Sequence, residues 1–271
     1  MSTEELENSN PALVVAFVPI PSSYSSSASQ VVFLRVLRGE RVILKFPIEI
    51  KAVAFDLDGT LVETLPDLHE SAIRMLAQIG RPAVPESTVR TYIGDGVDRL
   101  VKRLLTEKAD GEPDAALFEK AAASFRSHYA TVLTRASHPF AGAVSTLEIL
   151  RSRGFKLACV TNKPTRFTEP LLEGLALTGN LDLVLSGDSL PRKKPDALPL
   201  LHVASVFGIE PAQLLMVGDS PIDTAAARTA GCPVFCVPYG YRGSLAVREL
   251  DCDAIVATLP DLLDLIILAR S

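Results

Sequence analysis

The sequence lacks the features that mark nucleic-acid-binding, membrane and secreted proteins. Among its 271 residues, 27 lysines and arginines stand against 32 acidic residues, with no dominant basic cluster. An electrostatic nucleic-acid binder would need such a cluster. The apolar segment of residues 12–20 is interrupted by prolines and is shorter than the ~20 residues that cross a bilayer. The sequence begins with an acidic stretch, whereas a secretory signal begins with basic residues. We therefore expect neither a nucleic-acid partner nor a membrane span.

Cysteine is also scarce. The four cysteines show neither the spacing of a disulfide framework nor an accompanying histidine that would complete a zinc site. They are Cys159, Cys232, Cys236 and Cys252. We expect these side chains to be reduced and buried, which favours a cytoplasmic protein.

Residues 1–48 differ in composition from the rest of the chain. A serine-rich linker follows the apolar segment, and we expect this N-terminal extension to be poorly ordered and dispensable for chemistry. Within it, "VVFLRVLRGERVILKF" (residues 31–46) fits either a β-hairpin around residues 38–40 or an apolar remnant. A targeting role is the alternative interpretation of the extension.

From residue 48 onward, short apolar runs alternate with amphipathic helical segments. The run "IKAVAFDL" is followed by helical stretches up to about residue 133, with no strand-like run between them. After residue 139, strands and helices alternate, which implies right-handed crossovers and a parallel sheet. The sequence therefore predicts an α/β protein with a doubly wound, Rossmann-like parallel sheet and an inserted α-helical cap domain. We expect residues 49–64 and 139–271 to form the core and residues 65–138 the cap.

Polar side chains follow several strands of the predicted core. Ligands of open parallel sheets bind outside the carboxyl ends of the strands, so these residues are the candidates for a functional site. Asp56 and Asp58 are two residues apart after the first strand, and their charges repel. A divalent cation, and a reaction that uses one acid as nucleophile and the other as proton carrier, would explain the pair. The other candidates are Thr161, Asn162 and Lys163, then Lys194, then Gly218–Ser220 with Asp223.

Taken together, these residues resemble the four motifs of the haloacid-dehalogenase-like phosphatases. The motifs are "DLDGTL" from Asp56, then Thr161, Lys194 and "GDSPID" from Gly218, in that order. The resemblance covers residues 51–268. The stretches "FDLDGTLVETLPDL" and "TVRTYIGDGVDRLVKRLL" look most like those of bacterial phosphoglycolate phosphatases, although Glu63 stands where that family more often has an aspartate.

The resemblance implies a Mg²⁺-dependent phosphomonoesterase that hydrolyses 2-phosphoglycolate to glycolate and phosphate through an aspartyl-phosphate. Asp56 would attack the phosphorus, while Asp58 would protonate the leaving oxygen and then deprotonate water. Magnesium prefers oxygen ligands. Asp56, the backbone carbonyl of Asp58 and Asp219 would supply them, with Asp223 as a further ligand or as an orienting residue.

The remaining motif residues would hold the phosphate. The hydroxyl of Thr161 and the backbone N–H of Asn162 suit a phosphoryl oxygen, and Lys194 would offset negative charge as a compact cation. We expect Lys163 and Lys193, the neighbouring lysines, to be solvated.

Substrate choice would come from the cap, because the core binds only the phosphate. The sequence "YIGDG" precedes a predicted helix, and the free N–H groups of a helix start can seat a small anion. We expect Gly94 and Gly96 to face the core and help bind the substrate carboxylate. The alternative is a plain bend between helices with Asp95 as N-cap.

Other functions fit parts of the pattern. Another cap-type phosphatase, such as a pyrophosphatase or nucleotidase, or a sugar phosphomutase would share the core residues. A dehalogenase would not need Asp58, and a binding protein on an inactive scaffold would not keep all of the acids. We expect a small-molecule phosphomonoester as substrate and a monomer or homodimer.

Overall fold

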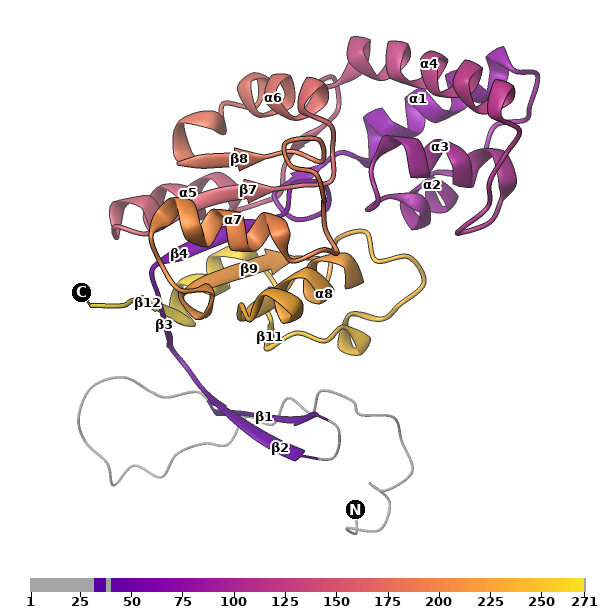
Figure 1. The fold of residues 1–271 in the computed structure, drawn as a ribbon. Helices are drawn as coiled ribbons and strands as arrows, with labels where there is room; N and C mark the ends of the chain where they lie inside the picture. The colour runs from indigo at the N-terminus through magenta and orange to yellow at the C-terminus, as the bar shows by residue number, and fades with distance from the viewer. Residues whose placement is uncertain (1–31, 38–39, 271) are drawn as a thin grey trace.

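The structure, a computed structural model, describes residues 32–37 and 40–270. Its core is a six-stranded parallel sheet in the order β11-β10-β9-β4-β7-β8 (Figure 1). The first of these strands in the chain, β4, therefore lies inside the sheet, and later strands add on both sides of it. The strands are β4 (Ala52–Phe55), β7 (Lys156–Val160), β8 (Leu183–Leu185), β9 (Leu214–Gly218), β10 (Val234–Cys236) and β11 (Ala254–Ile255). The predicted doubly wound α/β fold is confirmed.

Side chains alternate between the two faces of the sheet along each strand, and both faces are buried. Val53 and Phe55 of β4 belong to one hydrophobic cluster, which includes side chains of helices α5 and α6. Ala52 and Ala54 belong to the other cluster, which includes side chains of α7 and α8. The helices are α5 (Ala143–Ser152), α6 (Thr165–Gly174), α7 (Leu198–Phe207) and α8 (Pro221–Ala230). Helices thus cover the sheet on both sides, as Figure 1 shows.

Short elements accompany the sheet. Strand β1 (Val32–Leu37) pairs antiparallel with β2 (Glu40–Lys45), which confirms the hairpin interpretation. The rest of the expected poorly ordered extension, residues 1–31, lies outside the described residues. Strand β3 (Ile48–Ile50) pairs in parallel with β12 (Ile266–Leu268), which the sequence did not predict. Among the described residues, the 3₁₀ helices are η2 (Thr178–Asn180), η3 (Pro211–Gln213), η4 (Val247–Glu249) and η5 (Leu259–Asp264).

The cap consists of four helices inserted between β4 and β7 (Figure 1). In α3, the buried residues Val97, Leu100 and Leu104 follow the spacing of one helical face. In α4, the ring of Tyr129 lies 5.0 Å from that of Phe167 on core helix α6, so this end of the cap packs on the core. The helices are α1 (Leu65–Gln78), α2 (Glu86–Tyr92), α3 (Val97–Thr106) and α4 (Ala115–Val132).

The two segments that join the cap to the core lie side by side. Strand β5 (Val62–Glu63) pairs antiparallel with β6 (His138–Pro139). Next to them, the buried carboxylate of Asp67 on α1 accepts the N–H groups of Ala136 at 3.1 Å and of Ser137 at 2.7 Å. The hydroxyl of Ser137 also donates to Asp67 at 2.7 Å. Asp67 thereby fixes the returning segment against the first turn of α1.

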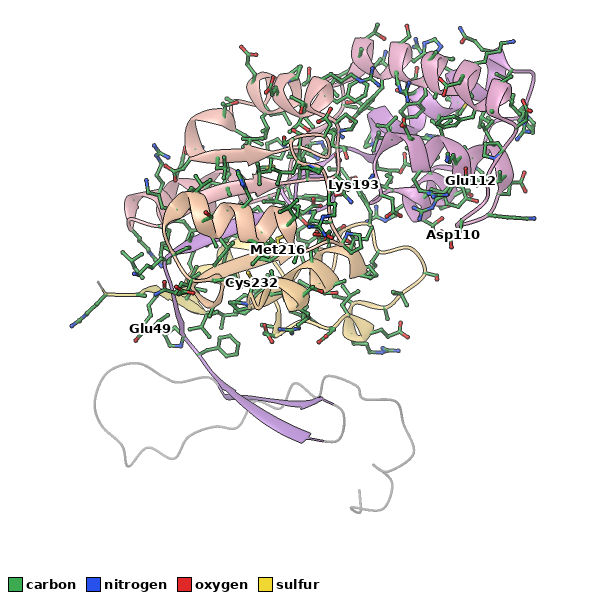
Figure 2. The ribbon with its side chains drawn as sticks, viewed as in Figure 1. Glu49, Asp110, Glu112, Lys193, Met216 and Cys232 are labelled. Carbon is green, nitrogen blue, oxygen red and sulfur yellow. The ribbon has the colours of Figure 1, made fainter. Side chains whose placement is uncertain are left out.

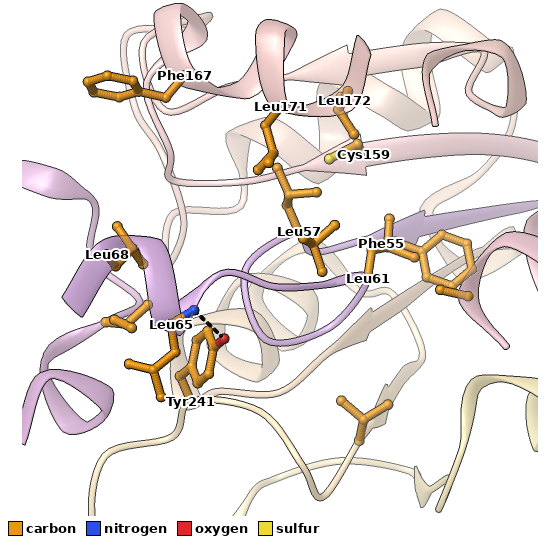
Figure 3. Packing of buried hydrophobic residues seen from close by; sticks show 14 of the residues in the cluster. Phe55, Leu57, Leu61, Leu65, Leu68, Cys159, Phe167, Leu171, Leu172 and Tyr241 are labelled. Atoms are coloured by element: carbon orange, nitrogen blue, oxygen red, sulfur yellow. Dashed lines mark hydrogen bonds between the residues drawn. The ribbon is translucent and has the colours of Figure 1, made fainter. Parts of the chain in front are cut away.

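Apolar packing continues from the sheet to the base of the cap. Figure 3 shows Leu57 and Leu61, both fully buried, between the sheet and the start of α1. The hydroxyl of Tyr241 accepts the N–H groups of Thr64 at 2.9 Å and Leu65 at 3.0 Å, which anchors the first turn of α1 on the core.

Within the described part of the chain, no helix combines the length and the apolar character needed to cross a bilayer. All four cysteines are buried and none forms a disulfide, as expected. Figure 2 labels one of them, Cys232, which belongs to the same hydrophobic cluster as Met216.

Asp67→Ala should destabilise the protein, because it leaves the buried N–H groups of Ala136 and Ser137 without their acceptor. We expect the free energy of unfolding, measured by urea denaturation, to fall by about 2–4 kcal/mol, since each unsatisfied buried group costs about 1–3 kcal/mol. The matched control is Glu119→Ala, which removes an exposed carboxylate from α4 and should change stability by less than about 0.5 kcal/mol. Similar losses in both variants would contradict this role of Asp67.

Candidate active site

The site lies at the carboxyl ends of β4, β7 and β9, the usual place for ligands of an open parallel sheet. The last residue of β4, Phe55, pairs with β7 on one side and with β9 on the other. The residues that follow the three strands therefore emerge next to one another. They are Asp56, Thr161 and Asp219.

Three buried carboxylates and one buried lysine form the centre of the site. Oxygen atoms of Asp56, Asp219 and Asp223 lie within 4.8 Å of one another. The Nζ atom of Lys194 donates to Oδ1 of Asp56 and to Oδ1 of Asp223, both at 2.7 Å. Each of these four side chains is buried. One permanent positive charge thus faces three groups that can each carry a negative charge.

This imbalance shifts the pKa values of the acids. The pKa of Asp56 is raised to about 7, and burial is the largest cause. The positive charge of Lys194 acts to lower this pKa, whereas the negative charges of Asp223 and Asp58 act to raise it. Burial and the charges of Asp56 and Asp223 also raise the pKa of Asp219. Burial acts to lower the pKa of Lys194, but the charges of Asp223 and Asp56 raise it above its ordinary value. A divalent cation among these oxygens would remove the excess negative charge, so the donor set fits one.

The backbone packs closely against Asp219. The N–H group of Tyr241 donates to Oδ2 of Asp219. A Cβ atom on Gly59 or Gly240 would overlap the same carboxylate, and Gly59 also has a φ of 89°, which side-chain-bearing residues rarely adopt. Tyr241 was not predicted as a site residue, because a tyrosine after a strand carries no specific chemical signal.

Asp223 has both carboxylate oxygens engaged. Oδ1 accepts from Lys194, while Oδ2 accepts the N–H group of Asp219 at 3.2 Å, the N–H group of Ser220 at 3.1 Å and the hydroxyl of Ser220 at 2.6 Å. Ser220 is the N-cap of α8, and Asp223 lies in the first turn of that helix. Of the two roles considered for Asp223, this geometry favours the orienting one.

A second ion pair joins the half-buried Asp58 to the buried Lys163. The Nζ atom of Lys163 lies 2.7 and 2.9 Å from the two carboxylate oxygens, and the hydroxyl of Thr64 donates to Oδ1 at 2.7 Å. Lys163 is 3% exposed, so the expectation that it is solvated is wrong, whereas Lys193 is exposed as expected. Burial acts to lower the pKa of Lys163, but the charge of Asp58 raises it. The one available signal was the position of Lys163, two residues after Thr161 at a strand end.

Thr161 and Asn162 occupy the turn after β7. The hydroxyl of Thr161 accepts the N–H group of Lys163 at 3.2 Å. The side-chain amide of Asn162 donates to the carbonyl oxygens of Lys194 at 2.9 Å and of Gly94 at 3.2 Å, so it ties the Lys194 loop and the cap to the core. Its Oδ1 atom is buried and has no hydrogen-bond partner among the described residues.

A cavity lies between the core and the cap at these residues. Its core side is polar and its cap side is largely apolar. Lys193, labelled in Figure 2, donates to the carbonyl oxygen of Asp95 at 2.7 Å and so joins the two units beside the cavity. The core side carries Asp56, Asp58, Thr161, Asn162 and Lys163, and the cap side carries Leu68, Ile93, Gly94, Gly96, Val97 and Leu100.

Helix α3 begins at this cavity without a side-chain cap. Its N-cap is Gly96, with a φ of 89°. The alternative in which Asp95 caps the helix is therefore wrong, and the carboxylate of Asp95 instead pairs with Arg103. The first N–H groups of α3 thus lie near the cavity lining formed by Gly96 and Val97.

The raised pKa of Asp56 predicts a pH-dependent gain in stability from metal binding. The folded, metal-free protein holds this proton up to about pH 7, whereas the ordinary value is 3.8. The stability linked to this proton is therefore fully present below about pH 4 and is lost as the pH rises through about 7. Above that range a divalent cation replaces the proton as the neutralising group.

Metal-stripped protein should therefore gain more in Tm from Mg²⁺, Mn²⁺ or Ca²⁺ at about pH 8 than at about pH 5.5. Thermal unfolding with and without each cation measures the difference, and sodium chloride of equal ionic strength is the control. A gain in Tm that is the same at both pH values would contradict the conclusion that the cation replaces the proton on Asp56.

Comparison with known proteins places the chain in a family. Residues 50–231 match the model of the haloacid dehalogenase-like hydrolases. The chain is 54% identical over 216 residues to a phosphoglycolate phosphatase of Thiobacillus denitrificans, covering 80% of this chain and 95% of that protein. It is 50% identical over 216 residues to a phosphoglycolate phosphatase of Nitrosospira multiformis, with the same coverage of both chains.

A solved structure agrees with these relatives. The crystal structure of a predicted phosphoglycolate phosphatase from Haemophilus somnus matches with a TM-score of 0.76 at 36% identity, covering 80% of this chain and 97% of that one. The acids and the lysine of the four motifs meet at one edge of the sheet, as such a relationship requires. The chain therefore belongs to the haloacid dehalogenase-like hydrolase family.

Proposed function

We propose that this chain is a phosphoglycolate phosphatase, which hydrolyses 2-phosphoglycolate to glycolate and inorganic phosphate. The observation that carries the proposal is the buried group of Asp56, Asp219, Asp223 and Lys194 next to a cavity under the cap. It occurs in a chain that is 54% identical to a phosphoglycolate phosphatase over 80% of its length. The four buried cysteines, none of which forms a disulfide, fit a reducing compartment, and we propose the cytoplasm.

The relatives decide between this activity and its closest alternatives. A pyrophosphatase, a nucleotidase or a sugar phosphomutase would need the same core residues, so the core alone does not separate them. The phosphoglycolate phosphatases among the relatives include proteins 54%, 50% and 41% identical to this chain, each aligned over about four-fifths of it. Alignments of this length include the cap, where the substrate beyond the phosphate would be bound.

Magnesium is the proposed metal. Asp56, Asp219 and the backbone carbonyl of Asp58 would hold it, with Asp223 orienting the loop that carries Asp219. When bound, Mg²⁺ would neutralise part of the charge on the phosphoryl oxygens, which otherwise repel an anionic nucleophile. Lys194 supplies a further positive charge, 2.7 Å from Oδ1 of Asp56.

In the first step, a carboxylate oxygen of Asp56 attacks the phosphorus and forms an aspartyl-phosphate. The ester P–O bond breaks, its electron pair stays on the glycolate oxygen, and protonated Asp58 gives that oxygen a proton. Thr161 and Asn162 line the cavity beside the two acids, where they can hold a phosphoryl oxygen.

In the second step, water attacks the phosphorus of the aspartyl-phosphate and gives a proton to Asp58. The bond between the phosphorus and the Asp56 oxygen breaks, which releases phosphate and restores both residues. Lys163 and Thr64 hold the side chain of Asp58 in the lining of the cavity, where it can accept this proton.

The substrate carboxylate would bind at the start of α3. Gly94 and Gly96 line the cavity from the cap, and no side chain caps the helix there. The backbone N–H groups of that first turn can therefore bind a small anion, with the helix dipole in their favour.

Asp56→Asn should abolish hydrolysis of 2-phosphoglycolate, because a neutral amide cannot act as the nucleophile and binds a metal more weakly than a carboxylate does. We expect kcat to fall by at least about 10³-fold with little change in the far-ultraviolet circular dichroism. EDTA should abolish wild-type activity, and added Mg²⁺ should restore it. Turnover by Asp56→Asn near the wild-type rate would show that another residue is the nucleophile.

Gly96→Ala should raise KM for 2-phosphoglycolate more than KM for p-nitrophenyl phosphate, which lacks the carboxylate. The added Cβ would lie 2.9 Å from the carbonyl oxygen of Asn162 and would displace the start of α3. We expect a difference of at least about fivefold between the two changes in KM.

Gly80→Ala is the matched control for this comparison. Gly80 also has a positive φ, 72°, but it follows the C-cap of α1, and nothing lies within 4 Å of its added Cβ. Both KM values of this variant should stay within about twofold of wild type. Equal increases for the two substrates in Gly96→Ala would argue against carboxylate binding at this turn.

A further inference from the structure

The ion pair between Lys163 and Asp58 lies in the lining of the cavity where the proposed reaction occurs. Nζ of Lys163 contacts both oxygens of Asp58, at 2.7 and 2.9 Å, and the lysine side chain is 2% exposed. A contact to both oxygens restricts rotation of the carboxylate as well as its position. Thr64 holds only Oδ1, at 2.7 Å, so Lys163 is what fixes the second oxygen.

The backbone of Lys163 is fixed from both sides. Its N–H group donates to the hydroxyl of Thr161 at 3.2 Å. Its carbonyl oxygen accepts the N–H group of Gly187 at 2.8 Å and the hydroxyl of Thr168 at 3.1 Å. Pro164 follows and restricts the backbone conformation of Lys163 to extended values. The side chain therefore starts from a well-defined point at the end of β7.

The ammonium group is confined on its other side by the cap. Nζ lies 5.0 Å from the centre of the Tyr129 ring on α4, a distance at which a cation and an aromatic ring attract each other. Tyr129 is fully buried and packs on Phe167 of α6, so the ring is itself held in place. Nζ of Lys163 thus contacts both the Tyr129 ring and Asp58. The other buried lysine of the site, Lys194, contacts Asp56 and Asp223 instead.

We propose that Lys163 is a positioning residue that orients the carboxylate of Asp58 for its two proton transfers. The inference rests on the proposed phosphatase activity. Lys163 acts through Asp58 and not through the phosphate. Its loss should therefore slow the two steps that move a proton, which are protonation of the leaving oxygen and deprotonation of the attacking water. It should matter little for the attack of Asp56 on a phosphate whose leaving group needs no proton.

The test compares Lys163→Met with wild type on two substrates. With 2-phosphoglycolate, kcat/KM should fall about 10- to 100-fold, a part of the ~10²–10⁴ that general acid–base catalysis contributes. With p-nitrophenyl phosphate, kcat/KM should stay within about threefold, because p-nitrophenolate leaves without a proton. The kcat of Lys163→Met with p-nitrophenyl phosphate should fall, because hydrolysis of the aspartyl-phosphate still needs Asp58. The first turnover should then appear as a burst of about one p-nitrophenolate per site.

Two controls separate positioning from general damage. Lys156→Met removes an exposed lysine from the start of the same strand and should leave all these constants within about twofold of wild type. Lys163→Gln retains a hydrogen-bond donor without the charge, and it replaces the methionine variant in the same comparison if that variant does not fold. We expect it to show the same split between substrates at a smaller amplitude.

Equal losses of kcat/KM with the two substrates would overturn the inference, since they would mean that Lys163 binds the phosphate or only supports the fold. Unchanged kcat/KM with 2-phosphoglycolate would also overturn it. Failure of wild type to hydrolyse 2-phosphoglycolate would refute the proposed function alone. In that case any alkyl phosphate that the enzyme hydrolyses serves in the same comparison, because an alkoxide leaving group also requires a proton.

Discussion

The structure depends on the balance between four carboxylates and two lysines in a site largely closed to water. Removing an ion from water costs several kcal/mol, so each lysine is stable there only because it contacts acids, and each acid is stable only near a cation. The acids still outnumber the lysines by two, and one divalent cation would balance this excess of negative charge. The groups are Asp56, Asp58, Asp219 and Asp223, with Lys163 and Lys194.

The order of strands in the sheet is what brings these groups together. Because β4 lies between β7 and β9, the residues after three strands that are far apart in the sequence become neighbours at one edge. The cap is inserted directly after β4, so its two connecting segments begin beside the acids. Thr64 shows the consequence, since it precedes α1 and yet its hydroxyl donates to Asp58. The same connection that carries the cap also helps to hold the proton carrier.

Much of this could be predicted from the sequence because it depends on local patterns. Apolar runs that end in polar residues located the strand ends, and helical spacing located the cap. The burial of Lys163 could not be predicted, because it depends on Asp58 and on Tyr129, which come from distant segments. Its position just after β7 is the one local feature that distinguishes Lys163 from the exposed Lys193, and it does not by itself predict burial. The pairing of β3 with β12 was missed because strands of three residues are too short to show a period.

Tyr241 extends the same argument from the acids to the cap. Its N–H group contacts Asp219, and its hydroxyl accepts the N–H group of Leu65 at the start of α1. From the cap, the guanidinium of Arg90 lies 5.1 Å from the centre of the Tyr241 ring and donates to the carbonyl oxygen of Gly240 at 3.0 Å. The loop that positions an acid of the proposed metal site is therefore also the surface on which the cap rests. Any movement of α2 away from the core must break these contacts, so the position of the cap and the surroundings of Asp219 are coupled through the core loop itself.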